Sequence, residues 1–325
     1  MTTERSFLIG DRLTVPRMAL GTMFFGTTVP TDRAHACLDR AFGLGARFWD
    51  TANNYSSWVG GTGDESELCL GDWFAARGPS ARDGVVLATK VGARAAPGGN
   101  GLADALGLAR DVVRPQVVDS LRRLRTDRVD VLYAHLDDVT TPFAEALAAL
   151  SELVDEGLVG RIAASNLTAA RLREALATPS QHRYQALQQR FSYLDPCVGF
   201  GVQIVLDDEV TEICAREGIT LLGYSTLLAG AYTRADRPLP DGYDTPANRQ
   251  ALAALAEEAD RAGLDRGQTV LAWMVQRRRP VIPVVGASSP EQVDAAWQAT
   301  ATPLDAAALD RLDRARVGER QGAHR

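Results

Sequence analysis

Short apolar segments recur along this chain, and each is followed by a stretch whose apolar residues repeat with a helical period. Eight strand candidates are found, at Met18–Met23, Arg47–Thr51, Val85–Lys90, Val129–His135, Arg161–Ser165, Ala186–Arg190, Thr220–Tyr224 and Val281–Val284. Eight strands that alternate with eight helices are typical of one architecture. We therefore predict an α/β fold, a (β/α)8 TIM barrel that forms a single domain over residues 1–325.

Residues typical of helix ends separate the strand candidates. Thr31 is suited to open a helix that runs to Phe42. Pro115 lies near the start of a helix predicted over Val112–Leu124, where proline is tolerated because its missing N–H would be unpaired there anyway. These signals support the alternation of strands and helices.

Further elements are expected outside the alternating pattern. Phe7–Val15 reads as an N-terminal hairpin that closes the bottom of the barrel, with its turn at Gly10-Asp11. Asp305–Arg316 reads as a C-terminal amphipathic helix, and residues 318–325 as a flexible tail.

The composition is that of a soluble globular protein, with 46% hydrophobic and 23% charged residues. A net charge of −6 argues against a general nucleic-acid binder. The four cysteines show no spacing typical of a metal site or a disulfide framework, so we expect reduced thiols and no metal. There is no signal-peptide pattern and no apolar run near the length of about 18 residues that spans a bilayer. We expect a cytoplasmic protein without a membrane partner.

Polar residues stand where the strand candidates end. Active sites of (β/α)8 barrels lie at the carboxyl ends of the strands. The residues found there are Asp50, Lys90, His135, Ser165, Asn166, Gln188, Tyr224 and Gly286. This set is mostly polar or titratable, whereas the strand bodies are apolar, so we expect the chemistry at this face.

Lys90 is the only lysine among the chain's 35 basic residues, and it ends a predicted buried strand. An arginine side chain keeps its charge, whereas the pKa of a lysine is readily shifted by its surroundings. Lys90 is therefore a candidate for chemistry that arginine cannot perform. The competing interpretation is a codon bias that left one lysine by chance.

Asp50, Tyr55, Lys90 and His135 together form a candidate catalytic group. Tyr55 follows Asp50 on a loop that can return over the barrel mouth. A phenol with a pKa of about 10 is a poor acid at neutral pH, and a nearby lysine ammonium would lower that pKa. Asp50 would hold Lys90 charged, and His135 would orient a carbonyl or relay a proton. Such a group suits protonation of an alkoxide as hydride arrives at carbon.

Each of these residues also has a structural interpretation. Asp50 alone would be read as a strand-end cap, Tyr55 as an exposed loop aromatic, and His135 as a structural histidine. The presence of all four at matched strand ends favours the catalytic interpretation.

Nine segments follow one another from residue 20 to about residue 300 in an order typical of one family. They are Leu20–Met23, Phe48–Tyr55, Gly63–Glu67, Ala88–Val91, Val129–His135, Ala164–Asn166, Gly223–Ser225, Pro283–Ser288 and Glu291-Gln292. With these segments the chain resembles the aldo-keto reductases. The Asp-Thr-Ala triplet with its tyrosine, the Thr-Lys pair and the Ser-Asn pair are highly specific in combination.

The resemblance implies a reductase that uses a nicotinamide cofactor, with Tyr55 as general acid. Ser165, Asn166 and Gln188 would then hydrogen-bond the nicotinamide carboxamide, since amides and hydroxyls supply both donors and acceptors. Tyr224 would stack on the nicotinamide ring. The other residues that the resemblance assigns to the cofactor are Thr22, Met23, Asp50, Ser225, Leu227, Gly230, Arg234, Gly286, Ser288 and Gln292.

The segment Ser225–Gly230 resembles the family's loop around the pyrophosphate, where backbone amides bind the anion. The chain has no Gly-x-Gly-x-x-Gly sequence, which disfavours a Rossmann dehydrogenase.

Some positions depart from the family pattern. Ser288 and Ser289 lack the neighbouring cation that often holds the 2′-phosphate of NADP, and Ala295-Ala296 replace a Glu-Asn pair. Arg234 could supply a more distant charge. We expect NADPH as the cofactor, with NADH left open.

Two loops are long for this fold, Asn53–Gly63 and Val91–Leu108. They suggest an altered substrate pocket. Phe24 and Trp58 are candidates for its walls.

The leading interpretation is an NADPH-dependent reductase of an aldehyde or a ketone, with a keto sugar and a polyketide-like ketone among the candidate substrates. Alternatives are oxidation of a hydroxyl with NADP⁺ and reduction of an enone. A third alternative is a cofactor-sensing regulatory subunit, since potassium-channel beta subunits are similar to this family. Residue types do not indicate the oligomeric state or the stereochemistry.

Overall fold

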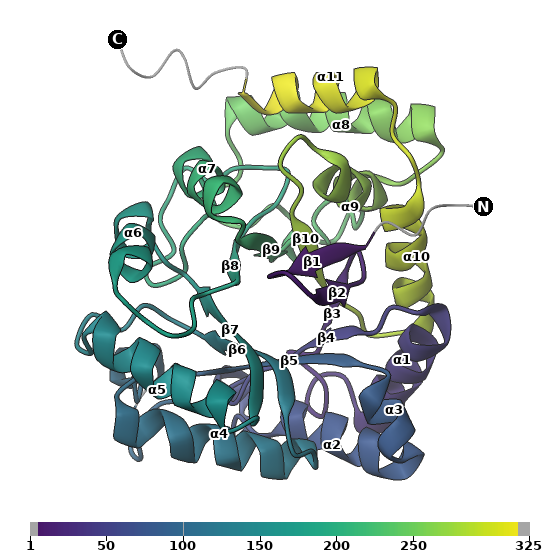
Figure 1. The fold of residues 1–325 in the computed structure, drawn as a ribbon. Coiled ribbons are helices and arrows are strands. Elements are labelled where there is room, and N and C mark those ends of the chain that lie inside the picture. Colours follow the sequence, from purple (N-terminus) through teal and green to yellow (C-terminus); the bar gives the residue numbers. More distant parts are fainter. Residues whose placement is uncertain (1–5, 100, 318–325) are drawn as a thin grey trace.

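Eight parallel strands close into a barrel in a computed structural model that describes residues 6–99 and 101–317 (Figure 1). The strands follow the order β10-β3-β4-β5-β6-β7-β8-β9, and β9 pairs with β10. Their bounds are β3 Ala19–Gly21, β4 Phe48–Asp50, β5 Val86–Val91, β6 Val129–Ala134, β7 Val159–Ser165, β8 Ala186–Arg190, β9 Thr220–Tyr224 and β10 Ile282–Gly286. The predicted (β/α)8 barrel is confirmed.

The strands are apolar because both of their faces are buried. In β4, Phe48 belongs to the cluster that fills the barrel, and the next residue, Trp49, belongs to the cluster between the barrel and the helices. Each strand contributes to the inner cluster, which contains Ala19, Phe48, Ala88, Val131, Ala163, Ala186, Leu222 and Ile282. This filled interior leaves the carboxyl ends of the strands as the place for a site.

The predicted hairpin closes the amino-terminal end of the barrel. Strands β1 (Phe7–Ile9) and β2 (Leu13–Val15) pair antiparallel, and Gly10 in their turn has a φ of +66°. Ile9 and Val15 are fully buried in the inner cluster. The hydroxyl of Thr220, at the start of β9, donates a hydrogen bond to the carbonyl of Leu8. The hairpin therefore lies opposite the face that carries the polar strand ends.

Helices surround the barrel, and the described residues contain more of them than the eight expected. They are α1 Thr31–Leu44, α2 Glu65–Arg77, α3 Pro79–Asp83, α4 Arg110–Leu124, α5 Phe143–Asp155, α6 Ala169–Ala177, α7 Asp208–Glu217, α8 Pro246–Ala262, α9 Arg266–Gln276, α10 Pro290–Ala301 and α11 Ala306–Val317. Short 3-10 helices are η1 Ser57–Val59, η2 Gly101–Asp104 and η3 Leu228–Gly230.

Helix α8 is an extra element between β9 and β10, where α9 already makes the connection. It packs against the predicted C-terminal helix α11, outside the ring of helices (Figure 1). The buried carboxylate of Glu258 in α8 accepts hydrogen bonds of 2.6 and 2.9 Å from the guanidinium of Arg311 in α11. The predicted tail, residues 318–325, lies outside the described residues.

The expected start of the helix that contains Pro115 was wrong. Helix α4 begins at Arg110, two residues earlier than Val112, so Pro115 lies inside the helix. The hydrogen bond that this proline cannot donate would have gone to the carbonyl of Asp111, in the first turn. The loss therefore falls close to the helix start.

Within residues 6–99 and 101–317, no helix is both long and apolar enough to cross a membrane. In the same part of the chain, no group of three histidine, cysteine, aspartate or glutamate side chains is arranged to hold a metal ion.

Candidate active site

Lys90 lies at the centre of a buried cluster where β4 and β5 end. Its Nζ donates hydrogen bonds to the Tyr55 hydroxyl at 2.6 Å, to the Thr51 carbonyl at 2.9 Å and to Asp50 Oδ1. The Tyr55 hydroxyl also lies 3.4 Å from Asp50 Oδ1. Lys90 and Asp50 are completely buried, so their ion pair is shielded from water. Three of the four residues of the candidate catalytic group are thus in direct contact.

Gln188 completes the shell around Asp50. Its Nε2 donates a hydrogen bond of 2.8 Å to Asp50 Oδ2, so both carboxylate oxygens have partners. The sequence had suggested that Gln188 lies at a strand end, but it is the third residue of β8, which spans Ala186–Arg190. We expected the Gln188 amide to bind the carboxamide of the cofactor, but its N–H group binds the Asp50 carboxylate.

The pKa of Tyr55 departs from our expectation. Burial raises the pKa of the Tyr55 phenol well above its usual value, and the negative charge of Asp50 raises it further. The net shift is therefore upward and not downward as expected, because burial and Asp50 outweigh the lowering of the pKa that the Lys90 ammonium gives by itself. Burial also lowers the pKa of Lys90, and the charge of Asp50 opposes that shift. Tyr55 is therefore a protonated phenol beside a cation.

His135 directly follows β6 and packs against Tyr55. The two ring centroids are 5.8 Å apart, and the ring planes meet at 76°. Burial lowers the pKa of His135 well below its usual value, and the charge of Lys90 lowers it further. The imidazole is therefore neutral near pH 7. Its Nδ1 is buried and has no hydrogen-bond partner among the described residues.

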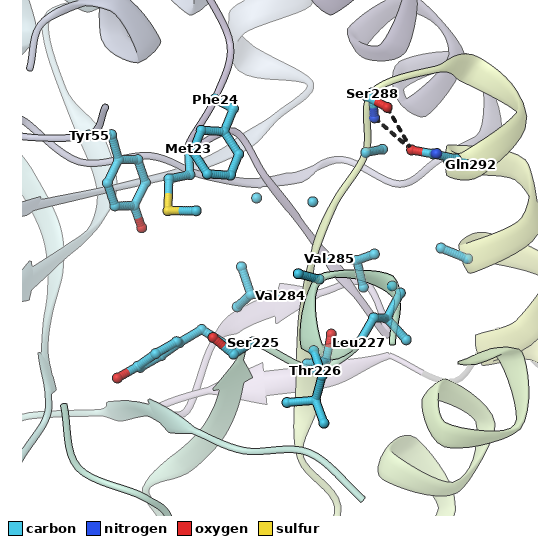
Figure 2. Close-up of a pocket in the computed structure, with 18 of the residues that line it drawn as sticks. Met23, Phe24, Tyr55, Ser225, Thr226, Leu227, Val284, Val285, Ser288 and Gln292 are labelled. Atoms are coloured by element: carbon cyan, nitrogen blue, oxygen red, sulfur yellow. Dashed lines mark hydrogen bonds between the residues drawn. The ribbon is translucent and has the colours of Figure 1, made fainter. Parts of the chain in front are cut away.

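A cavity of about 810 Å³ opens beside this cluster and runs past the ends of several strands. Figure 2 shows Tyr55 and Met23 on one side of it, and Ser288 and Gln292 on the other. The predicted residues that line it are Met23, Phe24, Tyr55, Trp58, His135, Ser165, Asn166, Gln188, Tyr224, Ser225, Leu227, Gly230, Arg234, Gly286, Ser288 and Gln292.

Thr22 was expected to contact the cofactor, but it does not line the cavity. It is completely buried. Its hydroxyl lies 3.0 Å from the carbonyl of Asp50 and 2.8 Å from the hydroxyl of Ser66. Thr22 therefore supports the end of β4 from behind.

Ser165, Asn166 and Tyr224 form a hydrogen-bonded group on the wall of the cavity. The Asn166 amide donates to the His135 carbonyl and to the Ser165 hydroxyl, each at 3.0 Å. The Tyr224 hydroxyl donates to Asn166 Oδ1 at 2.8 Å. Asn166 has a left-handed backbone with a φ of +61°. These contacts hold three polar side chains together at the ends of β7 and β9.

The segment Ser225–Gly230 turns repeatedly through left-handed backbone conformations. Ser225, Leu228, Ala229 and Gly230 have φ values of +57°, +47°, +55° and +92°. No hydrogen bond within the described residues uses the backbone amides of Thr226, Leu227 and Ala229. Residues 226–229 all line the cavity. A concave backbone with free N–H groups is a binding site for an anion such as a pyrophosphate.

Charged and polar groups at the far end of the cavity are already paired. Arg234 donates hydrogen bonds of 3.0 and 2.6 Å to the carboxylate of Asp236. The Ser288 amide and hydroxyl both contact Gln292 Oε1, at 2.8 and 3.2 Å (Figure 2). Arg234 is the one cation among the described residues that line the cavity.

A family model of the aldo/keto reductases matches residues 17–317. The chain belongs to the aldo/keto reductase family. It is therefore an oxidoreductase of a family whose members generally use NAD(P)H.

Relatives and solved structures agree with this assignment. The chain is 31% identical over 300 residues to norsolorinic acid reductase stcV of Emericella nidulans, which covers 86% of this chain and 73% of that protein. It is 30% identical over 315 residues to the uncharacterized oxidoreductase YrpG of Bacillus subtilis, which covers 95% of each. The holo form of aldo-keto reductase AKR11C1 from Bacillus halodurans superimposes with a TM-score of 0.75, at 25% identity and with 96% of each chain covered.

Some residues of this aldo/keto reductase site were not foreseen. Leu102, Leu136 and Gln203 line the cavity and come from three different loops. Arg94 contacts the loop that carries Tyr55, with its Nη1 2.6 Å from the Asn53 carbonyl. The length of the Val91–Leu108 loop marks the segment that contains Arg94 and Leu102, but it does not mark these two residues. No sequence signal marks Leu136 or Gln203.

Proposed function

We propose that the protein reduces the carbonyl of an aldehyde or a ketone to an alcohol, with NADPH as hydride donor and Tyr55 as general acid. The observation that carries the proposal is the contact of 2.6 Å between Lys90 Nζ and the Tyr55 hydroxyl, inside a buried cluster beside the cavity. A phenol with a raised pKa holds its proton until a stronger base forms. An alkoxide is such a base.

Each residue of the Tyr55 cluster has its own role in the proposed reaction. A bound nicotinamide would supply hydride for the carbonyl carbon. Tyr55 would give its proton to the carbonyl oxygen. The Lys90 ammonium stabilises the phenolate that remains. Asp50 keeps Lys90 charged and in place, and Gln188 fixes Asp50. Neutral His135 has a ring N–H that can orient the substrate oxygen.

The cavity wall fits a dinucleotide. The free amides of Thr226, Leu227 and Ala229 suit its pyrophosphate. Tyr224, Ser165 and Asn166 suit the nicotinamide end. A bound carboxamide would share or replace the present hydrogen bonds of Ser165 and Asn166. The holo form of the Bacillus halodurans relative supports a bound cofactor, and NADH is the alternative donor.

The direct experiment follows oxidation of NADPH by the purified protein against a panel of ketones, aldehydes and keto sugars. We expect NADPH to be oxidised only when a carbonyl compound is present, with one alcohol formed per NADPH consumed. Tight NADPH binding without oxidation against the whole panel would contradict the proposal. That result would favour a cofactor-sensing regulatory subunit.

A further inference from the structure

The end of the cavity nearest Tyr55 has large apolar side chains in its wall and no charged side chain among the described residues that line it. Its walls include Met23, Phe24, Trp58, Leu102 and Leu136. The charged residues that line the cavity, Arg234 and Asp265, lie around the segment 225–233 at the other end. A charged substrate would therefore lose its hydration at the Tyr55 end without gaining a partner. This end suits a neutral molecule.

Most polar side chains at the same end already have hydrogen-bond partners. Besides Asn166 and Gln188, the amide side chains at this end are Asn54 and Gln203. The Asn54 Nδ2 donates to the Ala93 carbonyl at 3.2 Å, and Gln203 Oε1 accepts from Arg190 at 3.0 Å. A polyhydroxylated substrate would leave most of its hydroxyls without partners.

Trp58 is a large aromatic side chain that remains exposed beside the proton donor. It is 55% exposed, and Leu102 in η2, which also lines the cavity, is 37% exposed. The Trp58 and Tyr55 ring centroids are 6.4 Å apart, and the ring planes meet at 82°. An aromatic group on a substrate whose oxygen contacts Tyr55 would therefore come within reach of the indole.

The loop that carries Trp58 is held in one conformation. Ser56 has a left-handed backbone with a φ of +68° although it is not glycine. Its hydroxyl donates to the Met23 carbonyl at 2.6 Å, and its carbonyl accepts from the amides of Val59 and Gly61. A strained residue of this kind persists only where its surroundings fix it.

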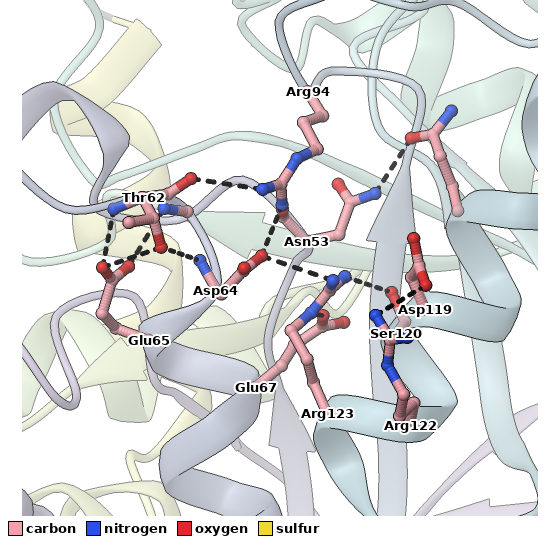
Figure 3. A network of polar contacts seen from close by, with 12 residues as sticks. Asn53, Thr62, Asp64, Glu65, Glu67, Arg94, Asp119, Ser120, Arg122 and Arg123 are labelled. Atoms are coloured by element: carbon pink, nitrogen blue, oxygen red, sulfur yellow. Dashed lines mark hydrogen bonds and ion pairs between the residues drawn. The ribbon is translucent and has the colours of Figure 1, made fainter. Parts of the chain in front are cut away.

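Arg94 ties the same loop to the second long loop (Figure 3). Its Nη1 donates hydrogen bonds of 2.6 Å to the Asn53 carbonyl and of 2.6 Å to Asp64 Oδ1. Arg123 of α4 also contacts Asp64 Oδ1, at 3.3 Å.

Glu65 fixes the end of the same loop, because its carboxylate accepts hydrogen bonds from the amides of Thr62 and Gly63 at 2.6 and 3.0 Å. The indole is thus presented by a fixed loop, which reduces the entropy that is lost when a ligand packs on it.

We propose that the substrate is a neutral aryl ketone or aryl aldehyde, whose ring packs on Trp58 while its carbonyl oxygen contacts Tyr55. This assignment of a substrate class rests on the proposed carbonyl reduction. In this assignment Trp58 recognises the ring of the substrate, and Tyr55 acts on its carbonyl.

The test compares substrates that differ only in aromaticity. Acetophenone is paired with cyclohexyl methyl ketone, and benzaldehyde with cyclohexanecarbaldehyde. For Trp58→Ala we expect kcat/KM to fall at least ~10-fold for the aryl substrates and less than ~3-fold for their saturated partners. Trp58→Phe should stay within ~3-fold of the natural protein on the aryl substrates. Val59→Ala is the matched control, because Val59 is an exposed apolar neighbour that does not line this cavity. This variant should leave kcat/KM unchanged for both the aryl and the saturated substrates.

Equal losses on aryl and saturated substrates, or no loss on aryl substrates, would overturn the role of Trp58. Failure of the proposed reduction is distinguishable, since no substrate would then oxidise NADPH even with the natural protein. In that case, binding of acetophenone to the NADPH-loaded protein, measured by saturation-transfer NMR, decides the recognition of the ring. Binding that Trp58→Ala abolishes supports it, and absence of binding, or binding that Trp58→Ala leaves unchanged, overturns it.

Discussion

The two ends of the cavity are built in different ways. At the Tyr55 end, Asp50, Lys90 and Gln188 project from barrel strands, are buried, and are hydrogen-bonded to one another. At the far end, Arg234 and Ser288 lie on loops and satisfy their polar groups with exposed neighbours. From this difference we expect the barrel to fix the groups for the proposed proton transfer and the loops to set the preference between NADPH and NADH. The two properties should therefore change independently.

The largest effect is expected from Lys90→Met. Removing the cation leaves the Tyr55 phenolate without stabilisation, so we expect kcat to fall at least ~100-fold, while the Kd for NADPH changes only a few-fold. Steady-state kinetics and quenching of protein fluorescence by NADPH measure the two quantities.

Asp50→Asn combined with Lys90→Met controls for folding, because it also removes the unpaired buried carboxylate that the single variant would leave. Near-normal turnover in Lys90→Met would contradict the role of Lys90. A loss of NADPH affinity as large as the loss of turnover would contradict the independence of the two ends.

A smaller effect is expected at the far end. Asp236→Asn releases Arg234 from its bidentate ion pair, and the freed guanidinium can approach a 2′-phosphate. We expect the ratio of the Kd for NADH to the Kd for NADPH to rise about 5- to 20-fold, with kcat nearly constant. Asp241→Asn removes the same charge from an exposed position in the same loop and serves as control. An equal rise in both variants would show that net charge, and not Arg234, sets the preference.

The smallest change in kcat/KM is expected when the pH is varied near neutrality. Because burial and Lys90 hold the pKa of His135 well below its usual value, His135 stays neutral and does not titrate near pH 6.5. The kcat/KM for carbonyl reduction should then vary less than about 3-fold between about pH 6 and 8. At higher pH it should fall as Lys90, whose pKa burial lowers, loses its proton. A decline below about pH 6.5 that His135→Gln removes would contradict a neutral histidine.

The barrel and the Tyr55 end were predictable because strand periodicity and the barrel rule place particular residues on one face. Asp50 is the last residue of β4 and Lys90 is the last but one of β5, so both follow from the expected strand ends. The hairpin Phe7–Val15 was equally clear from its short strands and its glycine turn. Helix α8 was not, because an amphipathic helix that packs on α11 has the same pattern as one that packs on the barrel.

Other features depend on contacts between segments far apart in sequence. That Gln188 binds Asp50 could not be read from spacing, since the two residues are joined only by closure of the barrel. The raised pKa of Tyr55 depends on burial and on the closeness of Asp50, and a residue list shows neither. The contact of Arg94 with the loop of Trp58 likewise requires the folded positions of both loops.

The central claim is that Tyr55, supported by Lys90, gives its proton to the substrate oxygen. The most direct test is Tyr55→Phe, assayed for carbonyl reduction and for NADPH binding in the same preparation. This variant keeps the ring and removes the hydroxyl, so we predict loss of turnover of at least ~100-fold with NADPH binding preserved. Turnover close to that of the natural protein would contradict the claim, because another group would then have to supply the proton.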